Sequence, residues 1–211
     1  MERFGDDADP ALVAEAAKYR VFQVRWPVLD GVFGEGLLVQ PKRTPLAHVV
    51  VVPDADQTPE QLLGLSPGLN PQQQYARRLA ENGFELVIPM LLSRSKLETE
   101  DAGLRRSDQT NREWIYRQAF HMGRHIIGYE VQKVLTAVDW FETQDTSARI
   151  GVVGYAEGGL IAFYAAAIDT RIDAVLVSGY FDARENVWAE PIYRNVWSLL
   201  RRFGDAEIAS L

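Results

Sequence analysis

The chain has 211 residues, a formal net charge of −7 and no cysteine. A chain of this length is expected to form one domain with a sizeable core. The negative charge argues against a nucleic-acid-binding surface, and the lack of cysteine excludes disulfides, thiolate metal sites and a cysteine nucleophile. No apolar run approaches the roughly 20 residues that cross a bilayer. With Met1 as the true start, the absence of an apolar leader in residues 1–7 predicts a cytoplasmic protein.

The first half of the sequence predicts strands and helices that alternate. Pro10 suits the first turn of a helix over residues 10–19. A second helix is expected over residues 70–80, ended by the turn at Gly83. Residues 93–111 are polar and charged and are expected to form a long loop. The strands expected in this half are Val21–Trp26, Gly36–Val39, His48–Val52 and Phe84–Ile88.

The second half continues the alternation. We expect a long helix over residues 112–141, a strand over 149–153, a helix from Glu157, a strand over 174–177 and a helical end from about Val187. The strands are apolar throughout rather than alternating, which is typical of strands buried on both faces. The pattern predicts an α/β fold with a mostly parallel sheet flanked by helices, and the first two strands as an antiparallel edge.

A turn bounded by glycines joins the strand predicted over residues 149–153 to the helix predicted from Glu157. Gly154 and Gly158 stand two residues before and two after Ala156. This is the small-x-nucleophile-x-small pattern of a nucleophile elbow, a strained strand-to-helix turn where larger neighbours would clash. Ala156 has no hydroxyl or thiol, so the pattern predicts the turn without its nucleophile. An ordinary tight strand–helix connection is the alternative. A dinucleotide fingerprint would need glycine at 156, and a P-loop would need lysine after Gly159.

The elbow, the order of secondary-structure elements and the local amino-acid sequence together resemble the α/β-hydrolase superfamily. Within it, the chain is most similar to the dienelactone hydrolase and acetyl xylan esterase-like branch. Two stretches carry this resemblance: Gly154-Tyr-Ala-Glu-Gly-Gly-Leu-Ile-Ala162 and Arg171-Ile-Asp-Ala-Val-Leu-Val-Ser-Gly-Tyr-Phe181. The resemblance implies acyl transfer through an elbow serine on small esters or acetylated carbohydrates, without a cofactor.

The resemblance also implies a catalytic triad, in the chain order nucleophile, acid, histidine. Ala156 stands at the nucleophile position. His48, His121 and His125 are the chain's three histidines, and all precede the elbow. Asp182, which follows the last predicted strand, is a candidate acid, and a solvated loop carboxylate is the alternative interpretation. The triad is therefore expected to be broken at two places, which in such enzymes costs orders of magnitude in rate.

The backbone amides of such a site can remain even where the side chains of the triad are lost. By resemblance, the amide of Glu157 and one from Asp54 or Ala55 would form an oxyanion hole. Such donors do not depend on side-chain identity, although the Glu157 side chain would oppose an anion there; a helix N-terminus satisfied by water is the alternative. His121 and His125 are four residues apart but lack the glutamate of a zinc motif and a third ligand, so we expect no metal site.

By resemblance, a complete fold of this family has further strands that carry the acid and the histidine. We therefore expect either a truncated chain or a naturally shortened pseudoenzyme. Residues 174–177 would then form an apolar sheet edge prone to self-association. Two functions follow: a member of the ester-hydrolase lineage that is inactive as this chain, or a non-catalytic binding or assembly module. Natural loss and a deliberate substitution at Ala156 would leave the same sequence.

Overall fold

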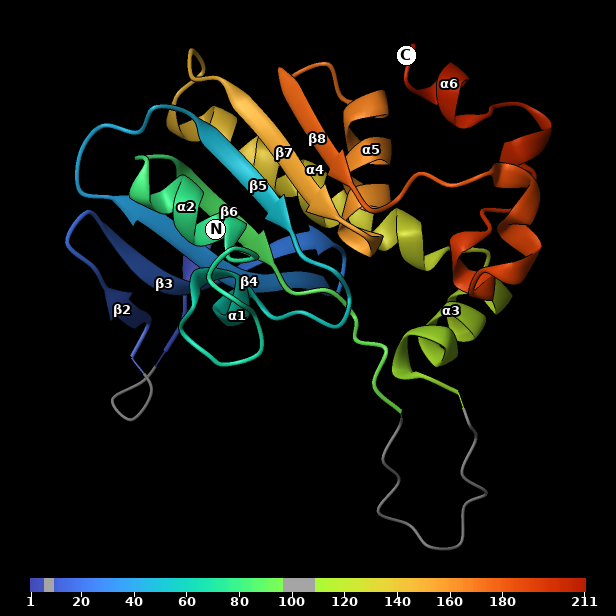
Figure 1. The fold of residues 1–211 in the computed structure, drawn as a ribbon, viewed down its shortest axis with the longest axis horizontal. Helices are drawn as coiled ribbons and strands as arrows, with labels where there is room; N and C mark the ends of the chain where they lie inside the picture. Colours follow the sequence, from blue (N-terminus) through green and yellow to red (C-terminus); the bar gives the residue numbers. More distant parts are fainter. Residues whose placement is uncertain (6–9, 97–108) are drawn as a thin grey trace, which may run out of the picture.

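A mixed eight-stranded sheet forms the centre of the fold in the computed structural model, which describes residues 1–5, 10–96 and 109–211 (Figure 1). The strand order is β1-β3-β4-β6-β5-β7-β8, and β2 also pairs with β3. The strands are β1 Glu2–Arg3, β2 Leu12–Glu15, β3 Tyr19–Leu29, β4 Val32–Pro41, β5 His48–Val52, β6 Glu85–Pro89, β7 Ile150–Tyr155 and β8 Ala174–Ser178.

Helices cover both faces of this sheet (Figure 1). The α-helices are α1 Pro59–Leu63, α2 Tyr75–Glu81, α3 Asn111–His121, α4 Ile126–Gln144, α5 Glu157–Ile168 and α6 Asp205–Ile208. Three short 3-10 helices lie between β8 and α6: η1 Arg184–Ala189, η2 Ile192–Arg194 and η3 Leu199–Arg201. Helices α4 and α5 pack on one face in one apolar core, and α1 and α2 pack on the other face in a second. None of the described helices is both long enough and apolar enough to cross a membrane.

The sheet combines a parallel half with an antiparallel half. Strands β6, β5, β7 and β8 are parallel neighbours. Strands β1 to β4 pair antiparallel, and β4 joins the parallel half by an antiparallel pairing with β6. The predicted antiparallel edge is confirmed. The sheet as a whole is mixed rather than mostly parallel.

The apolar strands lie where the sequence predicts them. All five residues of β5 are buried, and so are all five of β6. His48, the one polar residue of β5, stacks on Phe141 of α4 with ring centroids 4.6 Å apart. Its Nδ1 lies 2.9 Å from a carboxylate oxygen of Glu85. Burial on both faces therefore explains why the run is apolar and why its single imidazole has a carboxylate beside it.

The predicted N-terminal helix over residues 10–19 is wrong. Residues 12–15 form strand β2, which pairs antiparallel with β3. The amide of Gln23 donates to the carbonyl of Ala11 at 2.8 Å, and the amide of Ala16 donates to Tyr19 at 2.9 Å. Backbone pairing with a long neighbouring strand thus overrides the local helical preference.

Two other predicted helices have different bounds. Residues 71–73 form turns, so α2 begins only at Tyr75 rather than near residue 70. The single helix expected over residues 112–141 is two helices, α3 and α4. Gly123 has φ +71°, which a helix does not accommodate, and the Nδ1 atom of His125 caps α4 by accepting from the Ile127 amide at 3.2 Å. The loop predicted over 93–111 lies mostly outside the described residues.

The helical end predicted from Val187 is also only partly correct. Residues 184–201 contain three short 3-10 helices separated by irregular backbone, and α6 has four residues. Pro191 cannot continue a helical hydrogen-bond ladder, and Ser198 adopts a left-handed conformation with φ +66°. Within residues 179–211, all of which the structure describes, no strand follows β8.

Candidate functional site

Ala156 stands at the apex of a sharp turn between β7 and α5. Its backbone has φ 51° and ψ −109°, a conformation that L-residues rarely adopt. Its amide donates to the carbonyl of Ser178 at the end of β8 at 2.8 Å, and its carbonyl accepts from Leu160 at 3.2 Å. The chain therefore holds the apex residue in a strained conformation although alanine brings no reactive group.

The two flanking glycines are required by close backbone approach. A Cβ atom on Gly154 would lie 2.0 Å from the carbonyl oxygen of Gly158. A Cβ on Gly158 would lie 2.2 Å from the carbonyl oxygen of Val52 at the end of β5. Both clashes are with backbone, so a side-chain movement cannot relieve them. This spacing of small residues is the steric requirement that the elbow pattern predicts.

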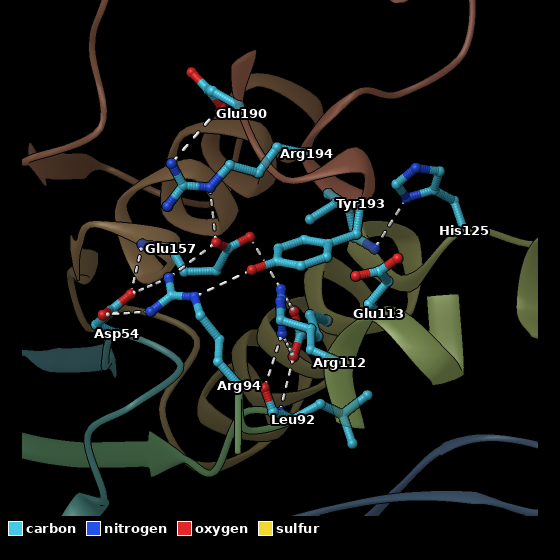
Figure 2. A network of polar contacts seen from close by, with 12 residues as sticks. Asp54, Leu92, Arg94, Arg112, Glu113, His125, Glu157, Glu190, Tyr193 and Arg194 are labelled. Carbon is cyan, nitrogen blue, oxygen red and sulfur yellow. Dashed lines mark hydrogen bonds and ion pairs between the residues drawn. The ribbon is translucent and has the colours of Figure 1, made fainter. Parts of the chain in front are cut away.

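The first amide of α5 has an internal partner. The Glu157 N–H donates to Oδ1 of Asp54, which lies just after β5, at 3.0 Å (Figure 2). Arg94 holds the same carboxylate with two further bonds, Nη2 to Oδ1 at 2.7 Å and Nη1 to Oδ2 at 2.8 Å. An acidic side chain thus occupies the positive end of the helix dipole.

These contacts set the charge of Asp54. Partial burial is the largest influence and acts to raise the pKa of its carboxyl group. The hydrogen bonds from Arg94 and from the Glu157 amide, together with the positive charge of Arg94, outweigh this desolvation. The pKa of Asp54 is therefore lowered from its ordinary value, and the group is a carboxylate at neutral pH.

The Glu157 side chain turns away from the helix start and into the protein. It is fully buried, and its two oxygens accept from three arginines. The distances are 3.1 Å from Arg112, 2.9 Å from Arg194 and 3.2 Å from Arg94 (Figure 2). The expectation that this side chain would oppose an anion at the helix start is therefore wrong, because its charge is directed elsewhere and compensated.

Arg112 and Glu130 form the deepest part of this network. Both side chains have no exposed surface. Two bonds join them, from Nη1 to Oε1 at 2.8 Å and from Nη2 to Oε2 at 2.5 Å. The backbone of Leu92 takes part at both ends: its carbonyl accepts from Arg112 at 3.1 Å, and its amide donates to Glu130 at 3.1 Å. The bidentate pair and its backbone partners offset much of the desolvation, although Nε of Arg112 has no hydrogen-bond partner among the described residues.

The segment that follows β8 completes the network. The hydroxyl of Tyr193 accepts from Nε of Arg94 at 3.1 Å, and Arg194 lies 3.7 Å from Glu190 as well as bonding Glu157. Residues from the β5 loop, α3, α4, α5 and η2 thus converge beneath the elbow (Figure 2). The sequence did not predict this network, because its members come from separate segments and Arg112 and Glu130 look like ordinary charges on two helices.

The remaining predicted residues do not assemble into a triad around Ala156. Asp182 is exposed, and the hydrogen bond recorded for it joins its carboxylate to the amide of Ala183 at 2.7 Å. His48 lies at the opposite end of β5 from Asp54, His121 is the exposed last residue of α3, and His125 caps α4. Among the described residues, no group of three metal-binding side chains occurs.

A groove lies beside the elbow, between α2 and the β7–β8 pair. It has a volume of about 420 Å³. Its lining is mostly apolar, with two tyrosines and few other polar groups: Tyr75, Arg78, Leu79, Asn82, Phe84, Val153, Gly154, Tyr155, Leu176 and Ser178. The Tyr75 hydroxyl donates to the carbonyl of Val52 at 3.3 Å, and burial raises its pKa well above the ordinary value. This tyrosine is therefore a neutral wall of the groove.

Solved structures of esterases share this fold. A Bacteroides fragilis protein with an inferred acetyl xylan esterase assignment matches with a TM-score of 0.68 at 18% identity, over 92% of this chain and 57% of its own. The acetyl xylan esterase of Paenibacillus sp. R4 matches with a TM-score of 0.56 at 18% identity, over 93% and 61%. Acetyl xylan esterase 1 of Thermoanaerobacterium sp. JW/SL YS485 matches with a TM-score of 0.54 at 16% identity, over 93% and 63%.

The chain spans about three fifths of the length of these solved structures. None of the curated protein sequences compared with it is significantly similar. The model of one protein family, the dienelactone hydrolase family, matches residues 35–186. This match covers most of the chain, from within β4 through β5, β6, β7, the elbow and β8, and it leaves out β1, β2 and β3. The chain therefore belongs to the dienelactone hydrolase family.

Proposed function

We propose that this chain is a non-hydrolysing member of the dienelactone hydrolase family that keeps the elbow as a scaffold and acts by binding. The observation that carries the proposal is Ala156 at the elbow apex, in the backbone conformation of a nucleophile and with a methyl group in its place. Acyl transfer through a covalent intermediate needs an oxygen or sulfur nucleophile at that position. The methyl group supplies neither a lone pair nor a proton.

A second observation supports the proposal. By resemblance, the amide of Glu157 and one from Asp54 or Ala55 are the donors of the oxyanion hole. The Glu157 amide donates to the Asp54 carboxylate, so the chain's own anion already occupies this donor. A substrate carbonyl would have to displace a carboxylate that Arg94 also holds with two bonds. Loss of one such donor alone typically lowers kcat by about 10²–10³.

Small esters and acetylated carbohydrates are the ligand class that we propose. The support is the acetyl xylan esterase naming of the structural neighbours. The groove beside the elbow offers about 420 Å³, within the usual range for small-ligand sites, and its few polar groups lie among apolar ones.

A serine-directed probe tests the proposal at the elbow. We would treat the wild-type chain, Ala156→Ser and Ala156→Ser/Asp54→Ala with a fluorophosphonate and quantify labelling by mass spectrometry. We expect background labelling for the wild type and for Ala156→Ser. The restored hydroxyl would have no imidazole beside it, and the Glu157 amide already donates to Asp54. Fast labelling of Ala156→Ser would show that only the hydroxyl is missing, and would contradict a scaffold without catalytic machinery.

Calorimetric titration tests the binding half of the proposal. We would titrate acetylated xylo-oligosaccharides into the wild-type chain, with the same oligosaccharides deacetylated as the matched control. Binding that requires the acetyl groups supports the proposed ligand class. A Leu176→Arg variant, which alters the groove lining, should weaken it. Equal heats for both ligands, or none, would overturn this ligand assignment without restoring a catalytic role.

A further inference from the structure

We propose that a hollow at the end of β5 opposite the elbow binds the phosphate group of a small, soluble phosphate monoester through Lys18, Arg43 and Thr44. The hollow has a volume of about 390 Å³, a size typical of small-ligand sites. Leu46, in its wall, lies just before β5, whereas Asp54 at the elbow follows β5. The hollow is therefore separate from the elbow, and the proposal stands whether or not the chain hydrolyses esters.

Three segments form the walls of this hollow: the turn between β2 and β3, the connection from β4 to β5 and the end of α2. Two backbone hydrogen bonds hold them together. The amide of Lys42 donates to the carbonyl of Lys18 at 2.8 Å, and the amide of Leu46 donates to Gly83 at 3.0 Å. All lining residues lie within residues 17–83, and the connection from β4 to β5 is at the left of the view, away from the C-terminal segment at the right (Figure 1). The hollow therefore owes nothing to the segment after β8.

The first argument is that two cations in the hollow have no anionic partner. Lys18 and Arg43 both line it, and neither forms an ion pair within the part of the chain that the structure describes. The Nζ atom of Lys18 donates to the backbone carbonyl of Glu81, at the end of α2, at 2.9 Å. A neutral carbonyl does not cancel the charge of an ammonium group. In a chain with a net charge of −7, such a local excess of positive charge favours an anion at this place.

The carboxylates of Glu81 and Glu15 do not cancel this excess. Glu81 lines the hollow, and its carboxylate accepts from Nε of Arg77 at 2.9 Å. Glu15 lies 2.7 Å from Nζ of Lys42 and accepts from Nε of Arg20 at 3.3 Å. The hydrogen bonds from Lys42 and Arg20 lower the pKa of Glu15, so one carboxylate is shared between two cations at neutral pH. The group therefore keeps a positive charge, which suits a ligand with more than one negative charge.

The second argument is that unused hydrogen-bond donors lie next to these charges. The backbone amides of Arg43 and Thr44 and the Thr44 hydroxyl have no hydrogen-bond partner among the described residues. A phosphate monoester carries a charge of about −1.5 to −2 at neutral pH and three strong acceptor oxygens, so it matches both the cations and the donors. Ala17, Pro41 and Leu46 line the same hollow and offer apolar surface to the organic group of the ester.

Three substitutions test the recognition of phosphate. Arg43→Ala removes the unpaired guanidinium, Lys18→Met removes the ammonium, and Thr44→Val removes only the hydroxyl. Arg124→Ala is the matched control, because Arg124 is an exposed arginine between α3 and α4 that forms no ion pair with any described residue. Circular dichroism would establish which variants fold. The Arg43 side chain has no hydrogen bond or ion pair within the described fold, so Arg43→Ala stays informative even if Lys18→Met does not fold.

Calorimetric titration with phenyl phosphate gives the readout, with inorganic phosphate and phenol as comparison ligands. All titrations are made at one ionic strength, because salt screens exposed charges. We expect saturable binding of phenyl phosphate by the wild type and by Arg124→Ala, weaker binding of inorganic phosphate and no binding of phenol. Arg43→Ala and Lys18→Met should each raise the Kd at least about tenfold, and Thr44→Val about fivefold.

Four results would overturn the proposal. The first is a wild type that does not bind phenyl phosphate saturably up to about 10 mM. The second is an equal loss of affinity in Arg43→Ala and Arg124→Ala, which would indicate a general effect of charge. Equally tight binding of inorganic phosphate would exclude the monoester, and retention on phosphatidic acid vesicles without binding of phenyl phosphate would assign the site to a lipid headgroup. None of these results depends on the elbow, so failure here leaves the proposed function untouched.

Discussion

The Asp54 carboxylate accepts a 3.0 Å hydrogen bond from the backbone amide of Glu157, at the first turn of the helix that follows the elbow. Asp54 is a loop residue after β5, and Glu157 lies 103 residues later in the chain. The bond joins the two loops that would surround a reacting carbonyl in an enzyme of this family. This hydrogen bond fixes the loop after β5 to the start of α5, so the stability of the elbow depends on the charge of the Asp54 carboxylate.

Acid should weaken this junction. The pKa of Asp54 in the folded protein lies below its ordinary value of 3.8, so the carboxylate stabilises the fold above that pH and the contribution is lost as pH falls through the folded pKa. Asp54→Asn should therefore lower the urea midpoint most at about pH 5–7 and progressively less below about pH 4. Urea unfolding at pH 7, 5 and 3 measures this. A deficit that is equally large at all three would contradict the assigned role of the charge.

Removing the buried guanidinium should be costly. Arg112→Met leaves Glu130 without its bidentate partner and takes one of three cations from Glu157. Loss of one member of a buried ion pair typically costs about 3–5 kcal/mol. Urea unfolding of Arg112→Met measures this loss against a matched control, Arg117→Ala. Arg117 is a partly exposed arginine on the same helix, paired with Glu113 at 2.7 Å.

The control change should cost less than about 1 kcal/mol, since exposed pairs contribute little. Similar losses for the two variants would show that the network beneath the elbow is not specially stabilising. A variant with both Arg112→Met and Glu130→Leu should recover part of the loss, because it leaves fewer uncompensated charges buried.

The elbow glycines should tolerate no side chain. Gly158→Ala places a methyl group 2.2 Å from the Val52 carbonyl oxygen, and relief requires a backbone shift. We expect a loss of at least about 1–3 kcal/mol, the usual range for overpacking. Gly128→Ala is the matched control, because a Cβ there meets nothing within 4 Å and the residue lies inside α4. That change should stabilise by about 0.5–1 kcal/mol. Thermal unfolding of both variants distinguishes steric demand from a general preference for glycine.

At the strained apex, introducing glycine should not destabilise the fold, unlike the removal of glycine at position 158. Ala156 has a positive φ that glycine adopts without a steric penalty. Ala156→Gly should therefore be neutral or stabilising, by up to about 1 kcal/mol after the entropic cost of glycine is included. Ala166→Gly, in the last turn of α5, should destabilise by up to about 1 kcal/mol. Equal losses in chemical denaturation would mean that the apex carries no strain.

Local patterns account for the parts of the fold that the sequence analysis predicted. The run His48–Val52 is apolar because both faces of β5 are covered, and the glycines at 154 and 158 are imposed by backbone atoms of the same turn and of β5. In both cases the physical constraint, burial or close backbone contact, applies to the same residues whose type shows it in the sequence. The sharp strand–turn–helix connection around Ala156 therefore lies where the sequence predicts it.

The errors arise where distant segments decide the outcome. Residues 10–19 suit a helix locally, but pairing with β3 makes part of them a strand. The buried network unites Asp54, Arg94, Arg112, Glu130 and Glu157, which are separated by up to about a hundred residues. The periodicity of a single segment cannot predict that residues so far apart in the sequence come into contact. Arg112 in particular appears in the sequence as one of several charges on a helix, and only the packing of α3, α4 and α5 makes it buried.

Turnover by the unmodified chain is the most direct test of the central claim, that the elbow of this protein is a scaffold without hydrolytic chemistry. We would follow p-nitrophenyl acetate hydrolysis by the purified wild type, with Ala156→Gly as the matched control that keeps the turn and also lacks a nucleophile. We predict the same rate for both, at the level of a non-catalytic protein surface. Saturable hydrolysis by the wild type that Ala156→Gly or Asp54→Ala abolishes would contradict the account.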